Sequence, residues 1–232
     1  ASLPGTCTHT VTQSDLYYAT DSWWINAVCT ATNTWQWWGQ NGMGTPADAI
    51  SNWTGVNLST NMVCTNSKGL TYCSETNDAT LAWRLYVKDV PATPYTIDIF
   101  WRSATPVITS EDSGIYFYDG TKLMGLENLT QSATNTLRVQ KITNVTTDSG
   151  TVAALFTNTN GPGPVWGGVC GRLANDGSTL TFAYSPTCHT YTTLFSESVG
   201  TFITPTKYGF GMVNVNSTAN TEEMWIPSIY VH

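Results

Sequence analysis

The residues of this chain that could catalyse acid–base chemistry are few and scattered. Glycoside hydrolysis with retention of configuration uses two carboxyl groups about 5–5.5 Å apart. The chain has two pairs of adjacent acids, Glu111-Asp112 and Glu222-Glu223. Neighbouring strand residues point to opposite faces of a sheet, so neither pair can form such a dyad. Glu127 and Glu197 remain as two acids that a fold could bring together across a sheet.

Nucleophilic and metal chemistry have equally little support. The chain has three histidines and no Gly-x-Ser-x-Gly motif; the histidines are His9, His189 and His232. Glu111, Asp112 and Asp119 supply oxygen atoms of the kind that calcium binds, but no loop spacing specifies a calcium site. The sequence therefore predicts no catalytic residues, no cofactor and no metal, with Ca²⁺ as the one cofactor left open.

Tryptophan clusters are the other chemical feature. Trp23-Trp24 and the run with Trp35, Trp37 and Trp38 are the densest. Consecutive tryptophans of one strand or loop cannot all enter one core. They therefore predict either a small core or subunit interface, or a surface where rings stack on sugars. Four other tryptophans lie in regular strand patterns and are expected in the core: Trp83, Trp101, Trp166 and Trp225.

The composition indicates sheets and excludes some partners. The 232 residues include 9 Lys and Arg and 16 Asp and Glu, too few to solvate amphipathic helices, against 10 Trp, 11 Tyr and 7 Phe. A net charge of −7 disfavours nucleic acid and anionic membranes as partners. No apolar run approaches the length of a membrane span, so membrane insertion is not expected.

Six cysteines predict disulfides, with buried free thiols as the alternative. Cys64 and Cys73 flank a turn at Lys68-Gly69, and Cys170 and Cys188 flank a hairpin at 175–177. Cys7 and Cys29 remain for each other. Three disulfides would place the chain in an oxidising compartment or outside the cell.

Five Asn-x-Ser/Thr sequons occur, about as many as the composition would produce by chance, so their number says nothing about glycosylation. They lie at Asn52, Asn57, Asn128, Asn144 and Asn216. Asn52 and Asn57 are the more plausible glycan acceptors, because their surroundings are rich in turn residues.

Short strand patterns between turn residues recur at intervals of roughly ten residues, as in antiparallel sandwiches. The expected strands include 81–87, 95–101, 115–118, 122–126, 136–142, 152–156, 165–173, 179–184, 191–196, 207–214 and 225–231. Asp119-Gly120 and Asn175-Asp176-Gly177 predict hairpin turns. Helix signals are almost absent; a helical turn or two is expected within Pro46 to Trp53, with Thr45 as the cap and Gly55 at the end.

We interpret residues 1–232 as a single domain. Residues 1–15 form an extended arm, 16–79 are Cys- and Trp-rich strands and loops, and 80–232 are the regular core. Residues 8–12 (Thr-His-Thr-Val-Thr) alternate well enough to add as a strand to a neighbouring molecule.

The regular part contains runs that are typical of one family. They are Trp83–Lys88 followed by Val90–Ile97, Gly114–Phe117, Leu137–Ile142, Asp176–Phe182, Phe195–Ser198 and Tyr208–Gly211. Together they resemble the concanavalin A-like lectin/glucanase jelly rolls, in the LamG-like version of phage virion or tail proteins and bacterial surface proteins. The resemblance covers about residues 80–232 and consists of core and turn residues, not reacting groups.

The resemblance implies an all-β, antiparallel two-sheet jelly-roll sandwich, here with a long, disulfide-decorated N-terminal region. It also implies sugar binding, host-surface contact or a structural role. The Glu-x-Asp-x-x-Glu strand motif of the glucanase branch is missing, and the six cysteines depart from the cysteine-poor phage version.

The function expected is a non-catalytic structural or adhesion module, extracellular or on a virion surface. It would assemble with itself or with other structural subunits, and could bind glycans. The alternative is a secreted glycoside hydrolase or polysaccharide lyase on the same scaffold.

Overall fold

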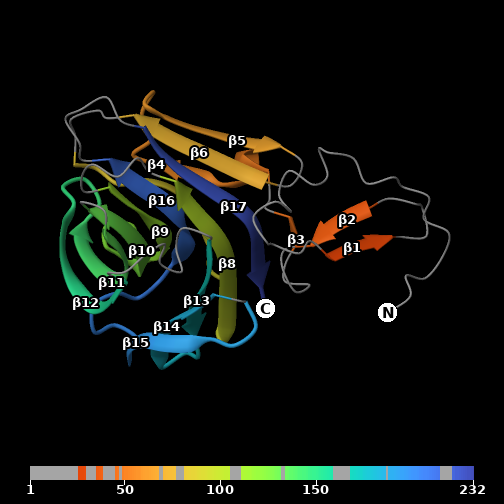
Figure 1. Ribbon diagram of the computed structural model, residues 1–232. Coiled ribbons are helices and arrows are strands. Elements are labelled where there is room, and N and C mark those ends of the chain that lie inside the picture. The colour runs from red at the N-terminus through yellow and green to blue at the C-terminus, as the bar shows by residue number, and fades with distance from the viewer. Residues whose placement is uncertain are drawn as a thin grey trace.

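The protein is an all-β sandwich of two antiparallel sheets (Figure 1). In this computed structural model the described residues are 26–29, 35–38, 45–46, 49–67, 70–76, 81–104, 111–131, 134–158, 168–186, 188–214 and 221–232. Every strand pairing among them is antiparallel. Within these ranges, no helix has the length and hydropathy to cross a membrane.

One sheet has seven strands. In spatial order they are β12 (Ser149–Asn158), β11 (Thr134–Asn144), β10 (Leu123–Gln131), β9 (Glu111–Tyr118), β16 (Lys207–Asn214), β7 (Arg84–Asp89) and β4 (Thr54–Val56).

The other sheet has eight strands. In order they are β15 (Thr192–Ser198), β14 (Thr179–Ser185), β13 (Val169–Asn175), β8 (Tyr95–Ala104), β17 (Thr221–Val231), β6 (Leu70–Thr76) and β5 (Met62–Ser67), with β3 (Thr45–Pro46) on β17. A separate two-stranded sheet, β1 (Asn26–Cys29) and β2 (Trp35–Trp38), is drawn beside the sandwich in Figure 1.

Two aspartate–glycine turns form as the sequence predicts. Asp119 Oδ1 accepts hydrogen bonds from the backbone N–H groups of Thr121 and Lys122, at 2.8 and 2.7 Å, between β9 and β10. Asp176 Oδ1 does the same for the two residues after Gly177, between β13 and β14. Gly120 and Gly177 have φ of 108° and 96°, a conformation that favours glycine.

Alternation along the strands divides the apolar residues between two cores. Ile115 and Phe117 of β9 lie in the main core between the sheets, together with Ile97 and Ile99 of β8. Tyr116 and its neighbours on the seven-stranded sheet instead form a second cluster on that sheet's outer face. This second core consists of Trp83, Leu85, Val87, Tyr116, Tyr118, Leu123, Ile142, Val145 and Val213.

Two of the three expected disulfides are confirmed, Cys64–Cys73 and Cys170–Cys188. Each bridges a hairpin, as the turn signals predict. The third pairing, Cys7 with Cys29, lies outside the described residues because Cys7 does. Structural disulfides are typical of proteins outside the reducing cytosol, which supports an extracellular location.

One helical turn forms within the predicted span Pro46–Trp53, but it begins after Ala49 instead of Thr45 and ends at Trp53 instead of Gly55. Thr45 and Pro46 pair with β17 as β3, and only Ile50–Asn52 forms a single 3-10 turn, η2, with Ala49 at its N-cap. Trp53 then turns into the main core, where its ring lies 4.9 Å from that of Phe210, centroid to centroid. The backbone of Trp53 is extended, with φ of −110° and ψ of 145°, and this ends the turn.

The sandwich also begins earlier than residue 80. β4 joins the seven-stranded sheet, and β5 and β6 join the eight-stranded sheet. Part of the Cys- and Trp-rich region therefore belongs to the same two sheets as the regular part.

Candidate functional site

The acids Glu127 and Glu197 do not meet. Glu127 lies on the outer face of the seven-stranded sheet, where it contacts Arg138. Glu197 contacts Lys141 at 2.5 Å. The Lys141 ammonium lies 5.1 and 5.5 Å from the rings of Phe195 and Phe202, which pack on the main core. The seven-stranded sheet therefore separates the two acids, and the dyad considered from the sequence is not formed.

Arg138 instead joins Glu127 to Asp112 across three strands. Its Nε donates to Glu127 Oε1, and another guanidinium nitrogen donates to Asp112 Oδ2 at 3.0 Å. Residue 127 stands opposite residue 138 in the β10–β11 register, and β9 lies on the other side of β10. The side chains of Glu127, Asp112 and Arg138 are 0, 6 and 13% exposed, so one cation offsets two buried carboxyl groups.

Two residues of the second core, Tyr116 and Trp83, contact acids in or near this cluster. The Tyr116 hydroxyl lies 3.4 Å from Glu127 Oε2, and the Trp83 indole N–H donates to Asp148 at 2.8 Å. Tyr116 reaches back over Gly114, where a Cβ atom would lie 2.9 Å from the tyrosine hydroxyl and 2.1 Å from a backbone oxygen.

Burial sets the protonation of these acids. It raises the pKa of Asp112 to about 7, with Asp148 adding to the shift and Arg138 opposing it. Burial and the nearby Asp112 also raise the pKa of Glu127 well above its usual value. A raised pKa suits a general acid, but a general acid must also reach its substrate, and Glu127 has no exposed surface.

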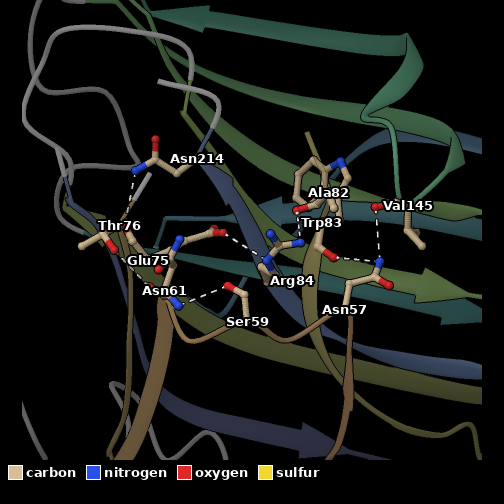
Figure 2. A network of polar contacts seen from close by, with 10 residues as sticks. All are labelled: Asn57, Ser59, Asn61, Glu75, Thr76, Ala82, Trp83, Arg84, Val145 and Asn214. Atoms are coloured by element: carbon tan, nitrogen blue, oxygen red, sulfur yellow. Dashed lines mark hydrogen bonds and ion pairs between the residues drawn. The ribbon is translucent and has the colours of Figure 1, made fainter. Parts of the chain in front are cut away.

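Another buried acid, Glu75, lies between the sheets (Figure 2). Glu75 Oε1 is 3.4 Å from Arg84 Nε, with side-chain exposures of 2 and 5%. Asn214 donates to the Glu75 carbonyl at 3.2 Å, and Arg84 donates to the carbonyl of Ala82 at 3.1 Å. Burial raises the pKa of Glu75 to about 8 despite the neighbouring guanidinium. The role of this pair is to join β6 to β7.

A half-exposed array of aromatic and charged side chains lies on the outer face of the eight-stranded sheet. Trp225 of β17 stands opposite Tyr72 of β6 and Arg102 of β8. Its ring centroid is 6.2 Å from that of Tyr72 and 5.0 Å from the Arg102 guanidinium carbon. The Tyr72 hydroxyl donates to Glu223 at 2.8 Å. We call these four residues the outer array.

A salt-bridged group continues this face along β8. Arg172 donates two hydrogen bonds to Asp98, at 2.7 and 2.8 Å, and lies 3.8 Å from the ring centroid of Tyr191. Since strands rise about 3.3 Å per residue, Asp98 lies about 13 Å from Arg102 on the same face. The outer face of this sheet therefore presents rings, guanidinium groups and the Glu223 carboxylate, while the Asp98 side chain is only 1% exposed. The presented groups can contact the apolar faces and the hydroxyls of a sugar.

The sequence predicts four strand tryptophans in the core, and Trp83 and Trp101 are indeed fully buried. The prediction is wrong for Trp225, because Met224 and Ile226 occupy the core positions of β17 and leave residue 225 outside. β2 contains Trp35, Trp37 and Trp38, and its backbone pairs with β1. The structure describes the backbone of these three residues but not their side chains. Trp23, Trp24 and Trp166 lie outside the described residues.

The other acids and histidines considered from the sequence do not form a common site among the described residues. Asp112 and Asp119 are at opposite ends of β9, so they cannot bind one calcium ion together. Among the described residues, no three His, Cys, Asp or Glu side chains lie together as a metal site. Glu222 is buried while Glu223 lies in the outer array, as strand alternation predicts. His189 is exposed, His232 lies 3.3 Å from Asp98, and His9 is outside the description.

Solved structures of other proteins have the same fold as this chain. No family model matches the chain, and no curated protein matches it. A legume lectin-like domain from Entamoeba histolytica superposes with a TM-score of 0.52 at 9% identity, covering 79% of this chain and 90% of that one. A Saccharomyces cerevisiae protein described as functionally unknown has a TM-score of 0.55 at 11% identity, covering 80% and 98%. The chain thus has the concanavalin A-like jelly-roll fold that its residues resemble.

A glycoside hydrolase shares the same architecture in part. The GH43B protein of a Bacteroides ovatus xyloglucan locus has a TM-score of 0.52 at 15% identity, covering 80% of this chain and 39% of that chain. The present chain therefore spans well under half of that enzyme. At such identities the likeness concerns the fold alone, which enzymes and lectins share.

Replacing Arg138 by Met should destabilise the protein by about 3–5 kcal/mol, because two buried carboxyl groups would lose their cation. Adding Glu127→Gln should recover part of this loss, since only Asp112 then lacks its partner. Chemical denaturation measures both. The matched control is Lys207→Met, whose partner Asp89 is 83% exposed and whose loss should cost less than about 1 kcal/mol. Equal losses for Arg138→Met and Lys207→Met would contradict the structural role of the cluster.

Stability should fall as pH rises from 5 to 8. Asp112 and Glu75 have folded pKa values raised to about 7 and about 8, so the folded state binds more protons than the unfolded state across this range. Their contribution is full below the unfolded pKa and is lost as pH rises through the folded pKa. Melting temperatures at pH 5 and 8 test this, and Glu75→Gln with Asp112→Asn should shrink the difference. A higher melting temperature at pH 8 would refute it.

Proposed function

We propose that this protein is a non-catalytic carbohydrate-binding module that works outside the cell. The observation that carries the proposal is the outer array. It places a half-exposed indole between a tyrosine and a guanidinium, with a carboxylate held beside them. Sugar-binding surfaces combine apolar contact with a few fixed polar groups, and these side chains offer both.

The disulfides and the fold support this proposal. The lectin-like domain from Entamoeba histolytica has the same architecture, and its description refers to a lectin. The competing proposal is a glycoside hydrolase, which the GH43B likeness favours. Against it, Asp112 and Glu127, two described acids that share a site, are buried and bound to Arg138.

Glycan-array binding tests the outer array directly. Trp225→Ala should weaken binding at least tenfold, about 1.4 kcal/mol, because it removes the ring that Tyr72 and Arg102 flank. Glu223→Gln keeps an oxygen for the Tyr72 hydroxyl but removes the charge, and should weaken binding less. Trp37→Ala is the matched control, since it tests the tryptophan cluster predicted from the sequence.

Two results would count against the proposal. If Trp37→Ala abolishes binding and Trp225→Ala does not, the β1–β2 tryptophans form the site instead. If the polysaccharides that bind also release reducing ends, and Glu127→Gln or Glu197→Gln stops this release, the protein is a hydrolase.

We further propose that the chain assembles into a larger surface object, such as a virion or a filament. β12 ends the seven-stranded sheet, and its ten residues include no charge and no proline. Its Val152 and Leu155 are 49 and 62% exposed. Such an edge is open to pairing, since proteins usually protect edges with charges, prolines or coverage. The uncharged, alternating segment 8–12 of a second copy suits it as an added strand.

Light scattering of the full chain tests this assembly. The wild type should be larger than the 25.3 kDa monomer, and Val152→Lys with Leu155→Lys should yield monomers, because charges block edge pairing. Val63→Lys on β5 is the matched control, because Val63 is 54% exposed on the other sheet. Deleting residues 1–14 should have the same effect as the β12 lysines. If the deletion leaves assembly intact, segment 8–12 is not the added strand.

A further inference from the structure

Asn144 and Asn57, two of the sequon asparagines, differ in their side-chain hydrogen bonding. Asn144 ends β11, and its Oδ1 accepts hydrogen bonds from the Thr146 backbone N–H at 2.9 Å and from the Thr146 hydroxyl at 2.8 Å. Its Nδ2 donates to no atom of the described residues. Asn144 is half-buried, and Thr146 and Thr147 beside it are exposed. The turn therefore fixes the amide oxygen and leaves the amide nitrogen available.

Asn57 has the opposite arrangement. Its Nδ2 donates to the carbonyl oxygens of Trp83 and Val145, at 3.2 and 3.4 Å, as Figure 2 shows. These bonds join the segment after β4 to β7 and to the turn after β11. A sugar on Nδ2 replaces one of its two hydrogens, so one of these bonds would be lost. Asn57 also has φ of 53°, a left-handed conformation that asparagine adopts more readily than most residues.

Asn128 is unsuitable for a different reason. It is 3% exposed and follows Met124 and Leu126 on the inner face of β10, between the two sheets. β9 and β11 pair with β10 on both sides of it. A glycan attached there would have to lie inside the main core, which close-packed side chains fill.

We propose that Asn144 carries an N-linked oligosaccharide. Its Nδ2 attacks the anomeric carbon of an oligosaccharide bound to a lipid pyrophosphate. The new C–N bond replaces the C–O bond to the pyrophosphate, the lipid pyrophosphate leaves, and a base takes one amide proton. The product keeps Oδ1 as acceptor for Thr146 and needs no other hydrogen bond to break.

The structure thus changes the choice among the five sequons. The sequence favoured Asn52 and Asn57 as glycan acceptors, because turn residues lie nearby. The hydrogen bonds of the Asn57 amide nitrogen argue against Asn57, whereas those of Asn144 leave its amide nitrogen available. Asn52 is exposed in η2 and Asn216 lies outside the described residues, and the proposal does not depend on either. It is also independent of the outer array, which lies on the other sheet.

Site mapping of the chain secreted from eukaryotic cells tests the proposal. Glycans are removed with an amidase in heavy-oxygen water, which converts each modified asparagine to labelled aspartate, and peptides are analysed by mass spectrometry. The peptide with Asn144 should carry the label, and those with Asn57 and Asn128 should not. An unlabelled Asn144, or a label at Asn57 or Asn128, would overturn the proposal.

Two variants at Thr146 separate glycosylation from the capping role of the turn. Thr146→Ser keeps the sequon and the hydroxyl, so the label at Asn144 should remain. Thr146→Ala removes the sequon but keeps Asn144 and the backbone N–H that it caps, so this label should be lost completely. A label that persists in Thr146→Ala would show that the modification is not sequon-dependent glycosylation, and the proposal would fail.

Discussion

The central strands of the seven-stranded sheet are buried on both faces, and much of the protein depends on this constraint. The main core covers their inner face, and the second core around Trp83 and Tyr116 covers their outer face. Polar groups on the outer face are therefore removed from water and must find partners inside the protein. Arg138 supplies the partner for Asp112 and Glu127. The outer array lies on the other sheet, where Tyr72, Glu223 and Trp225 keep part of their surface exposed.

Local signals in the sequence predict the parts of the fold that depend on local chemistry. Asp119-Gly120 and Asp176-Gly177 form their turns because an aspartate oxygen can cap the next N–H groups and glycine accepts a positive φ. The two confirmed disulfides follow from the same hairpins, which bring each cysteine pair together. The alternation of Leu137 and Val139 against Ile142 likewise assigns the two faces of β11.

The candidate sites depend on register and packing, which the sequence does not determine. Trp101 and Trp225 have similar strand contexts, but one faces the main core and the other faces outward, and a shift by one residue would exchange them. Glu127 meets Arg138 because β10 and β11 pair in one register. The helical turn within 46–53 is short for a similar reason, since Thr45 and Pro46 pair with β17 and Trp53 has an extended backbone.

Catalytic acids and buried structural acids both have raised pKa values. In Asp112 and Glu127 the burial that raises the pKa also closes the approach of a substrate. Burial therefore both raises the pKa of these two acids, as in a catalytic acid, and keeps them from contacting a substrate. Tyr72 differs, because it remains half-exposed and its hydroxyl is bonded to a carboxylate next to an indole. A surface of this kind gains little from proton transfer but can fix the orientation of a ligand, which is why recognition is the function that we propose.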